Sequence, residues 1–451
     1  MISMSLSKAA AAINASYEGH DVVFSGCSTD SRSIEKGNLF IALKGENFDG
    51  HDFVSIAEEK GAASLMLQQE VIHSLPVLKV ENTRKAMGLL AKTWREEIAI
   101  PVVAITGSNG KTTVKEMVSS VLSEVAEVHA TTGNLNNDIG VPLTLFGIDK
   151  KHRFAVIEMG ANHAGEIEWL SAISRPNVAV ITQCAPAHLE GFGSVEGVAR
   201  AKAEIFSGLQ SSGTAIINAD DAYVSFWQKT CEHKKQCTFG IASKYADVKA
   251  DNIKLFPEEA CTRFKLITKQ GSIDVDLKLL GKHNVLNALA AAACCLNLDV
   301  SLQSIKSGLE KMPPIKGRLQ VKQGKHDARI IDDTYNANPA SLSVALNVLS
   351  SYEGSRLMVL GDMGELGESA KQLHRNAGAE VKQAGVDALY TIGELSINAM
   401  ESFGEGASHY DSYEALSKAL LDKLNNQTTV LIKGSRSMHM ERIVNSLAEE
   451  H

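Results

Sequence analysis

The stretch Val102-Val103-Ala104-Ile105, followed by Gly107-Ser108-Asn109-Gly110-Lys111-Thr112-Thr113, decides how the middle of this chain folds. The apolar run predicts a buried strand, and the two glycines predict a tight turn directly after it. Beyond the turn, apolar residues recur at helical spacing, at Val114, Met117, Val118, Val121, Leu122 and Val125. The stretch therefore predicts a strand, a turn and a packed helix.

Such a turn places backbone N–H groups and the positive end of a helix around an anion. Lys111 adds a point charge for the outer phosphates, and the hydroxyl of Thr112 can reach Mg²⁺. Only two residues separate the glycines here, whereas the general phosphate loop has four. An alternative is that the glycines merely permit a tight turn. We expect a nucleoside triphosphate site made by Gly107, Asn109, Gly110, Lys111, Thr112 and Thr113.

Composition limits the classes of protein to consider. A chain of 451 residues is long enough for about three domains. A net charge of −8 without a basic block argues against nucleic acid or an anionic membrane as partner. Seven cysteines without a C-x-x-C pair indicate reduced thiols rather than disulfides or zinc. We expect a cytoplasmic protein, because the alanine run at 9–12 predicts a helix rather than a signal peptide and no apolar stretch could span a bilayer. We also expect a monomer.

Apolar runs that end abruptly in polar residues indicate the fold class. The runs at 154–157 and 178–181 alternate with helical patterns, which predicts a parallel sheet covered on both faces. Two prolines at 313–314 end a helix, and a second set of α/β patterns follows them. We expect an α/β protein with a small mixed substrate domain at 1–97, a central P-loop parallel-sheet ATPase domain at 98–314 and a Rossmann-like domain at 315–451.

Several further segments, taken in order, resemble the Mur ligase family from end to end. The central ones are TGSNGKTT at 106–113, NLNNDIGVP at 134–142, EMGANHAGEI at 158–167, AKAEIF at 201–206 and GKHNVLNA at 281–288. Others are STDSR at 28–32, GNLFIAL at 37–43, DDTYNANP at 332–339, VLGDMGELG at 359–367 and KGSR at 433–436. Within the family, the DDTYNANP and VLGDMGELG segments resemble most the members that add D-alanyl-D-alanine to UDP-N-acetylmuramoyl-tripeptide.

The resemblance implies a ligase of peptidoglycan precursor synthesis that uses ATP. A carboxylate is a poor electrophile, so the family transfers the γ-phosphoryl group to it, and the incoming amine attacks the acyl phosphate. Transfer of this kind rests on positioning and charge neutralisation. The resemblance implies Lys111, Lys202, His188 and Arg318 as catalytic residues. It implies two Mg²⁺ ions, with Thr112, Glu158, His188 and Lys202 as ligands, Lys202 being carbamylated by CO₂.

The resemblance also implies binding residues. Asn287 is expected at the adenine, Asp333 at the ribose, and Arg318 at the γ-phosphate when the third domain closes. For the UDP end of the nucleotide-sugar peptide we expect Ser31, Arg32, Lys44 and Gly45. For its path to the reaction centre we expect Asn134, Asn136 and Asn137. For the dipeptide we expect Tyr335, Asn336 and Asn338, together with the segment 433–436.

Simpler interpretations stay open for several of these residues. Glu158 could be a helix-capping or surface carboxylate, His188 could be a plain polar loop residue, and Lys202 could be a salt-bridging helix residue. The asparagines could serve only turns and helix faces. For the whole chain, the alternatives are folylpolyglutamate synthase, another amino-acid-adding Mur ligase, or a P-loop switch without ligase activity.

Overall fold

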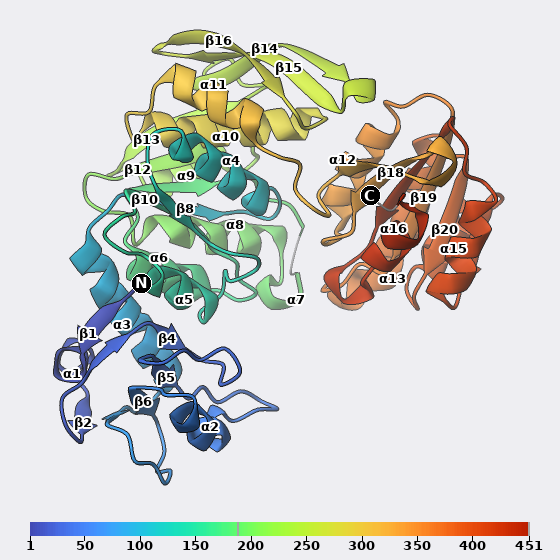
Figure 1. Ribbon diagram of the computed structural model, residues 1–451. Helices are drawn as coiled ribbons and strands as arrows, with labels where there is room; N and C mark the ends of the chain where they lie inside the picture. The colour runs from blue at the N-terminus through green and yellow to red at the C-terminus, as the bar shows by residue number, and fades with distance from the viewer. Residues whose placement is uncertain (187–188, 450–451) are drawn as a thin grey trace.

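The computed structural model describes residues 1–186 and 189–449, which form three regions that follow one another along the chain (Figure 1). Each region is built on its own sheet, and the order is mixed, then mainly parallel, then mainly parallel again. This agrees with the three-part α/β architecture expected from the sequence. No helix within the described part of the chain is long and apolar enough to cross a membrane.

The first region combines two small sheets with three helices. Its five-stranded sheet has the order β2-β7-β6-β5-β4, and β1 pairs with β3. The strands are β1 (Ser3–Ser5), β2 (Ser16–Glu18), β3 (Val23–Ser25), β4 (Cys27–Ser28), β5 (Leu39–Ile41), β6 (Ser64–Leu67) and β7 (Val77–Lys79). The helices are α1 (Leu6–Ile13), α2 (Val54–Glu59) and α3 (Thr83–Ile98).

Helix α3 joins the first region to the central one through a shared apolar core. Its residues Met87, Leu90 and Trp94 belong to the same buried cluster as side chains of the central region. Trp94 Nε1 donates a hydrogen bond to the carbonyl oxygen of Ile148 (2.9 Å), and the N–H of Ile2 donates to that of Phe146 (2.7 Å). The two regions are therefore fixed to each other by core packing.

The central region is a nine-stranded sheet of order β16-β15-β14-β13-β12-β11-β8-β10-β9. Its strands are β8 (Val102–Thr106), β9 (Val128–Ala130), β10 (Phe154–Glu158), β11 (Val178–Ile181), β12 (Thr214–Asn218), β13 (Lys235–Gly240), β14 (Val248–Phe256), β15 (Cys261–Thr268) and β16 (Gly271–Leu277). Its helices are α4 (Lys111–Ser123), α5 (Gly140–Phe146), α6 (Glu166–Ser174), α7 (Leu189–Phe192), α8 (Val195–Ala203), α9 (Val224–Thr230), α10 (Lys282–Leu296) and α11 (Leu302–Lys311).

Alternation along the central strands gives the sheet two apolar faces. In β8, Val103 and Ile105 belong to the cluster beneath α4, α10 and α11, whereas Val102 and Ala104 belong to the cluster that includes α3, α5 and α6. Figure 1 shows these helices on the two sides of the sheet. A parallel sheet covered on both faces brings polar residues together only at the ends of its strands.

Helix α4, which begins at the phosphate loop, is held in place by close packing against α11. A Cβ added to Gly308 of α11 would overlap the backbone of Val121 in α4. We expect Gly308→Ala to lower the free energy of unfolding by about 1–3 kcal/mol, because backbone atoms cannot give way as side chains can. Denaturant unfolding measures this. Gln303→Ala on the exposed face of α11 is the control, and equal stability of the two variants would contradict the packing argument.

The third region is a six-stranded sheet of order β17-β18-β22-β19-β20-β21, parallel except for β17. Its strands are β17 (Gln320–Gln323), β18 (Arg329–Asp333), β19 (Ser355–Gly361), β20 (Ala388–Ile392), β21 (Ala407–Tyr410) and β22 (Thr428–Lys433). Its helices are α12 (Pro339–Leu349), α13 (Ala370–Gln383), α14 (Ile397–Phe403), α15 (Tyr413–Leu421) and α16 (Glu441–Leu447). Buried clusters on both faces of this sheet make it a Rossmann-like unit.

Three details differ from the sequence-based expectations. Val125 lies beyond the end of α4 and is 48% exposed, because the helix stops at Ser123 and the chain turns away from the core. Thr112 and Glu158, expected in loops at strand ends, lie in the first turn of α4 and at the last position of β10. The antiparallel strands β15 and β16 extend the central sheet beyond anything predicted from the pattern.

Candidate active site

The phosphate loop connects the end of β8 to the start of α4. It is hydrogen-bonded to the residues that follow β11, the strand beside β8 in the sheet. The N–H of Ser108 donates to the carbonyl oxygen of Gln183 (2.9 Å), and Thr182 Oγ1 donates to that of Asn109 (2.6 Å). Gly107 has φ +148°, and a Cβ there would overlap the Thr182 hydroxyl. The loop therefore needs glycine at this position both for its conformation and for the approach of Thr182.

Lys111, the first residue of α4, folds back over this loop. Its Nζ donates a hydrogen bond to the carbonyl oxygen of Gly107 (2.7 Å). Burial lowers the pKa of Lys111, and the negative charge of Glu158 opposes that shift. The ammonium group is thus held at the helix N-terminus, where an anion would meet both the charge and the helix dipole.

Glu158 ends β10 beside this loop and is 2% exposed. Its Oε1 accepts a hydrogen bond from Asn136 Nδ2 (2.9 Å), and its N–H donates to Thr131 Oγ1 (3.0 Å). Oε2 is buried, and no atom of the described residues bonds to it. A buried carboxylate oxygen without a partner is costly, and a hard cation such as Mg²⁺ would satisfy it. The donor chemistry of the site therefore fits a magnesium ion.

Lys202 in α8 is 1% exposed, which is unusual for a lysine. Its Nζ lies 5.6 Å from the centroid of the Phe192 ring, and no described residue accepts a hydrogen bond from it. Burial, with a further contribution from the charge of Lys111, lowers the pKa of Lys202 to about 7. This environment disfavours the ammonium form of Lys202.

The third region reaches into the phosphate loop through Arg318. The Nη2 atom of Arg318 lies 3.4 Å from Thr112 Oγ1, and its guanidinium stacks over the ring of Tyr335 at 4.0 Å. Its Nε is buried and makes no hydrogen bond with any described residue. The planar group therefore has donors free for an anion held by the loop.

Asp333 and Lys433 face the same space from the ends of β18 and β22. Asp333 Oδ2 lies 2.5 Å from Lys433 Nζ, and Oδ1 accepts a hydrogen bond from the N–H of Leu319 (3.3 Å). Burial lowers the pKa of Lys433, and the negative charge of Asp333 opposes that shift. The two groups form a buried pair at the carboxyl edge of a parallel sheet, where ligands bind in such folds.

A cavity between the central and third regions is lined by some of these residues, but not by Lys111, Glu158 or Lys202. Its lining includes Asn109, Gly110, Thr113, Thr182, Gln183, His283, Asn284, Asn287, Arg318, Asp333 and Lys433. Asn287 Nδ2 donates to Asn284 Oδ1 (3.3 Å), and its own Oδ1 packs where Gly110 has no side chain. The structure thus brings together the residues expected at the nucleotide, although they come from distant parts of the chain.

Several residues that line this cavity were not singled out from the sequence as nucleotide-site residues, among them Thr182, His283 and Lys433. Thr182 directly follows strand β11, and Lys433 ends strand β22 after an apolar run. His283 lines the cavity as well, and burial lowers its pKa to about 4. His283 is the second residue of α10, whose N-cap is Gly281, and it does not follow an apolar strand. Its place in the segment 281–288 was the signal that the sequence offered.

The residues expected at the UDP end lie in the first region, away from this cavity. Ser31 is buried, whereas the Arg32 guanidinium is exposed and pairs with Asp30 at 2.8 Å. Lys44 lies 3.5 Å from Asp49, and the N–H of Gly45 donates to the carbonyl oxygen of Phe48 (2.8 Å). These residues belong to loops beside the small sheet.

The remaining asparagines divide between the site and local structure. Asn134 is exposed; Asn137 is exposed too, and its Oδ1 accepts the N–H groups of Ile139 and Gly140, which is turn chemistry. Asn136 instead contacts Glu158, as described above. His188 lies outside the described residues.

Asn336 and Asn338 flank the start of α12. Asn336 is exposed, and its Oδ1 accepts the N–H of Ala337. Asn338 caps α12, accepting the N–H of Ser341 at 2.8 Å, and its Nδ2 donates to Asn109 Oδ1 at 2.9 Å. Of the three residues expected at the dipeptide, Tyr335 and Asn338 therefore contact residues that line the nucleotide cavity, namely Arg318 and Asn109.

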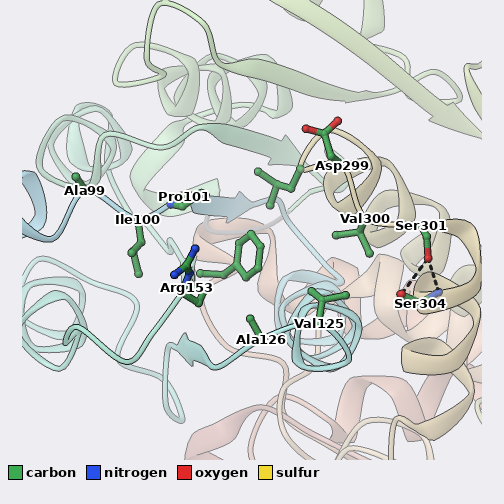
Figure 2. Close-up of a pocket in the computed structure, with 12 residues that line it drawn as sticks. Ala99, Ile100, Pro101, Val125, Ala126, Arg153, Asp299, Val300, Ser301 and Ser304 are labelled. Carbon is green, nitrogen blue, oxygen red and sulfur yellow. Dashed lines mark hydrogen bonds between the residues drawn. The ribbon is translucent and has the colours of Figure 1, made fainter.

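A second hollow, of about 800 Å³, lies at the opposite ends of the central strands (Figure 2). Its walls are mostly apolar, and the polar residues on it are Arg153, Asp299, Ser301 and Ser304. Ser301 and Ser304 bond to each other as a helix cap, which Figure 2 shows by dashed lines. The hollow lacks the converging cations and carboxylates of the nucleotide cavity, so we place the active site at the phosphate loop.

Family models match all three regions of the chain. The model of the Mur ligase family catalytic domain matches residues 23–95, that of the Mur ligase middle domain matches 105–295, and that of the Mur ligase glutamate ligase domain matches 317–436. Together they cover most of the sequence, in the order in which the three sheets occur.

Individual relatives match the whole chain. The UDP-N-acetylmuramoyl-tripeptide–D-alanyl-D-alanine ligase of Escherichia coli K12 is 42% identical over 450 residues, which cover 100% of this chain and 99% of the relative. A crystal structure of MurF from Acinetobacter baumannii superposes with a TM-score of 0.93 at 37% identity, covering 99% of this chain and 98% of the other. MurF from Thermotoga maritima in complex with ADP superposes with a TM-score of 0.84 at 26% identity, covering 93% and 96%. The chain belongs to the Mur ligase family.

Proposed function

We propose that the protein adds D-alanyl-D-alanine to UDP-N-acetylmuramoyl-tripeptide, with cleavage of ATP to ADP and phosphate. The observation that carries the proposal is the full-length likeness to ligases named for this reaction, at 42% identity. The geometry fits it, because residues of the phosphate loop line one cavity together with an arginine and a buried carboxylate, Asp333, from another region. The reaction belongs to the cytoplasm, where ATP is available, and a monomer suffices for it.

Each part of the cavity has a task in activating the carboxylate. The loop N–H groups and Lys111 hold the phosphates, Arg318 neutralises charge on the γ-phosphoryl group, and Asn287 and Asp333 bind adenine and ribose. The γ-phosphoryl group moves to the terminal carboxylate of the tripeptide, giving an acyl phosphate and ADP. The dipeptide amine then attacks the acyl carbon, phosphate leaves, and the amine loses a proton. Placing these groups between two regions excludes water from the acyl phosphate.

Magnesium would be held by Thr112 and Glu158, with His188 and a modified Lys202 at a second ion, and it would offset negative charge on the transferred group. Lys202 suits modification because a pKa of about 7 leaves much of its amine neutral near neutral pH. The neutral amine attacks CO₂ to form an N–C bond and releases one proton, which turns a cation into a carboxylate-like ligand. Burial among apolar groups protects the carbamate from exchange with water.

Substrate binding divides among the regions, and we place the domain boundaries at 97/98 and 314/315. Ser31, Arg32, Lys44 and Gly45 of the first domain bind the UDP end, and Asn134 and Asn136 lie on the path to Glu158. The dipeptide binds beside Tyr335, Asn336 and the segment 433–436 of the third domain. Asn137 serves the turn before α5 in this scheme.

Phosphate release tests the proposed reaction. We expect the purified protein, given Mg-ATP, to release phosphate only when UDP-N-acetylmuramoyl-tripeptide and D-alanyl-D-alanine are both present. A P-loop switch would release phosphate without either substrate, and folylpolyglutamate synthase or another Mur ligase would require different ones. Release with the tripeptide substrate and no need for the dipeptide would overturn the proposal.

A further inference from the structure

One hydrogen bond between the third region and the phosphate loop has a fixed direction. Asn338 Oδ1 accepts the N–H of Ser341 at the start of α12 (2.8 Å), and this N–H can only donate. The other end of the Asn338 amide must therefore be the NH₂ group. That group lies 2.9 Å from the side chain of Asn109, which must present its oxygen. The helix cap thus sets the orientation of two amides in succession.

The orientation of Asn109 decides which polar group is left for a ligand. With Oδ1 bonded to Asn338, its Nδ2 is the remaining end, and this atom is buried without a hydrogen-bond partner among the described residues. Asn109 lines the cavity between the phosphate loop and the third region. A buried N–H donor without a partner costs free energy that an anionic acceptor would recover. The opposite orientation would turn a carbonyl oxygen towards the same anion and repel it.

We propose that Asn338 is a positioning residue for nucleotide binding: by capping α12 it forces Asn109 to present an N–H donor to the nucleotide phosphates. The inference rests on the proposal that this loop binds ATP. It couples the two regions, because the amide of Asn109 is fixed only while the third region lies against the loop. By linkage, nucleotide binding then favours that contact by the same factor by which the contact favours nucleotide.

Two substitutions separate this role from that of a helix cap. Asn338→Ser keeps a capping oxygen but loses the amide donor, and we expect the dissociation constant of ATP to rise about tenfold. Asn338→Asp keeps the cap and replaces the donor by an acceptor, so Asn109 turns its NH₂ group towards Asp and its oxygen towards the phosphates. We expect a rise on the order of 100-fold. Serine and aspartate are both good helix caps. If Asn338 served only as a cap, the two variants would therefore have similar ATP dissociation constants.

Titration calorimetry with Mg-ATP and with ADP, on the full chain without other substrates, measures these constants. A double-mutant cycle with Asn109→Ala separates the effect from direct repulsion between Asp and phosphate. We expect Asn338→Asp to have little effect on ATP affinity when Asn109 is already alanine. Equal weakening in both backgrounds, or wild-type affinity in both Asn338 variants, would overturn the inference.

Ser412→Ala provides the matched control for folding. Ser412 caps α15 in the same region, accepting the N–H of Ala415 (3.1 Å), and lies outside the nucleotide cavity. We expect Ser412→Ala to lower the melting temperature and to leave ATP affinity unchanged. The Asn338 variants should instead weaken ATP binding and leave the melting temperature unchanged. Because the measurement needs no turnover, a failed ligase assay with intact ATP binding would count against the proposed reaction alone.

Discussion

Lys202→Ala is expected to lower substrate-dependent phosphate release by roughly 10²–10³-fold, the effect of removing one group that stabilises charge during transfer. The side chain is 1% exposed and has a pKa of about 7, so it is poorly suited to act as a fixed cation. As a carbamate it would supply an oxygen ligand, which alanine cannot. Steady-state phosphate release at saturating ATP measures the loss.

Chemical rescue distinguishes a lost ligand from a lost fold. We expect acetate or another short-chain carboxylate to restore part of the activity to Lys202→Ala, since it can occupy the space left beside Phe192. Lys234→Ala is the control, because Lys234 is a partly buried lysine of the same region that donates to the main-chain carbonyl oxygens of Leu209 and Gln210. Full activity of Lys202→Ala, or the absence of any rescue, would remove the support for a carbamate.

Glu158→Gln is expected to reduce phosphate release by roughly two to three orders of magnitude and to raise the magnesium concentration needed for half-maximal rate. Glutamine keeps the volume and an oxygen acceptor for Asn136 Nδ2, but it lacks the charge at the position of Oε2. That atom is the buried, unpartnered oxygen of the site. Titration of the rate with magnesium measures the effect, and a changed maximal rate at unchanged magnesium dependence would argue against a metal ligand.

A second carboxylate of the central region serves as the control for this prediction. Glu204 accepts the N–H groups of Gly165 (2.8 Å) and Glu168 (3.2 Å), so both of its oxygens cap the start of α6. Glu204→Gln also removes one negative charge, and we expect its magnesium dependence to match that of the unmodified protein. If both variants shifted it equally, the change would reflect overall charge rather than coordination.

Sequence patterns predicted the elements whose environment is uniform along their length. The strands after 101, 153 and 177 are buried on both faces, so their apolar runs were unbroken, and their ends were marked by polar residues. The prediction that Val125 packs on the apolar face of the helix was wrong, because the helical spacing of apolar residues continues past the residue at which α4 ends. The hairpin of β15 and β16 was missed because polar, half-buried or exposed residues interrupt the apolar pattern of both strands.

The site was predicted as a set of residues but not as contacts. Lys111, Glu158 and Arg318 were named from chemistry and resemblance, whereas the bond between Asn338 and Asn109 joins positions 229 residues apart. Local spacing carries no information about such a pair. Lys202 illustrates the same limit, since burial, which follows from the packing of α8, and the nearby charge of Lys111 explain why its pKa is low.

The shared core around α3 fixes the distance between the first region and the phosphate loop of the central region. Because Trp94 and its neighbours bury the first region against the central sheet, the loops at Arg32 and Lys44 keep a constant separation from the phosphate loop. A substrate anchored at one end of that span reaches the γ-phosphate only if its own chain is long enough. With the UDP end bound at these loops as proposed, a precursor that lacks one amino acid would be too short to bring its carboxylate to the phosphate loop.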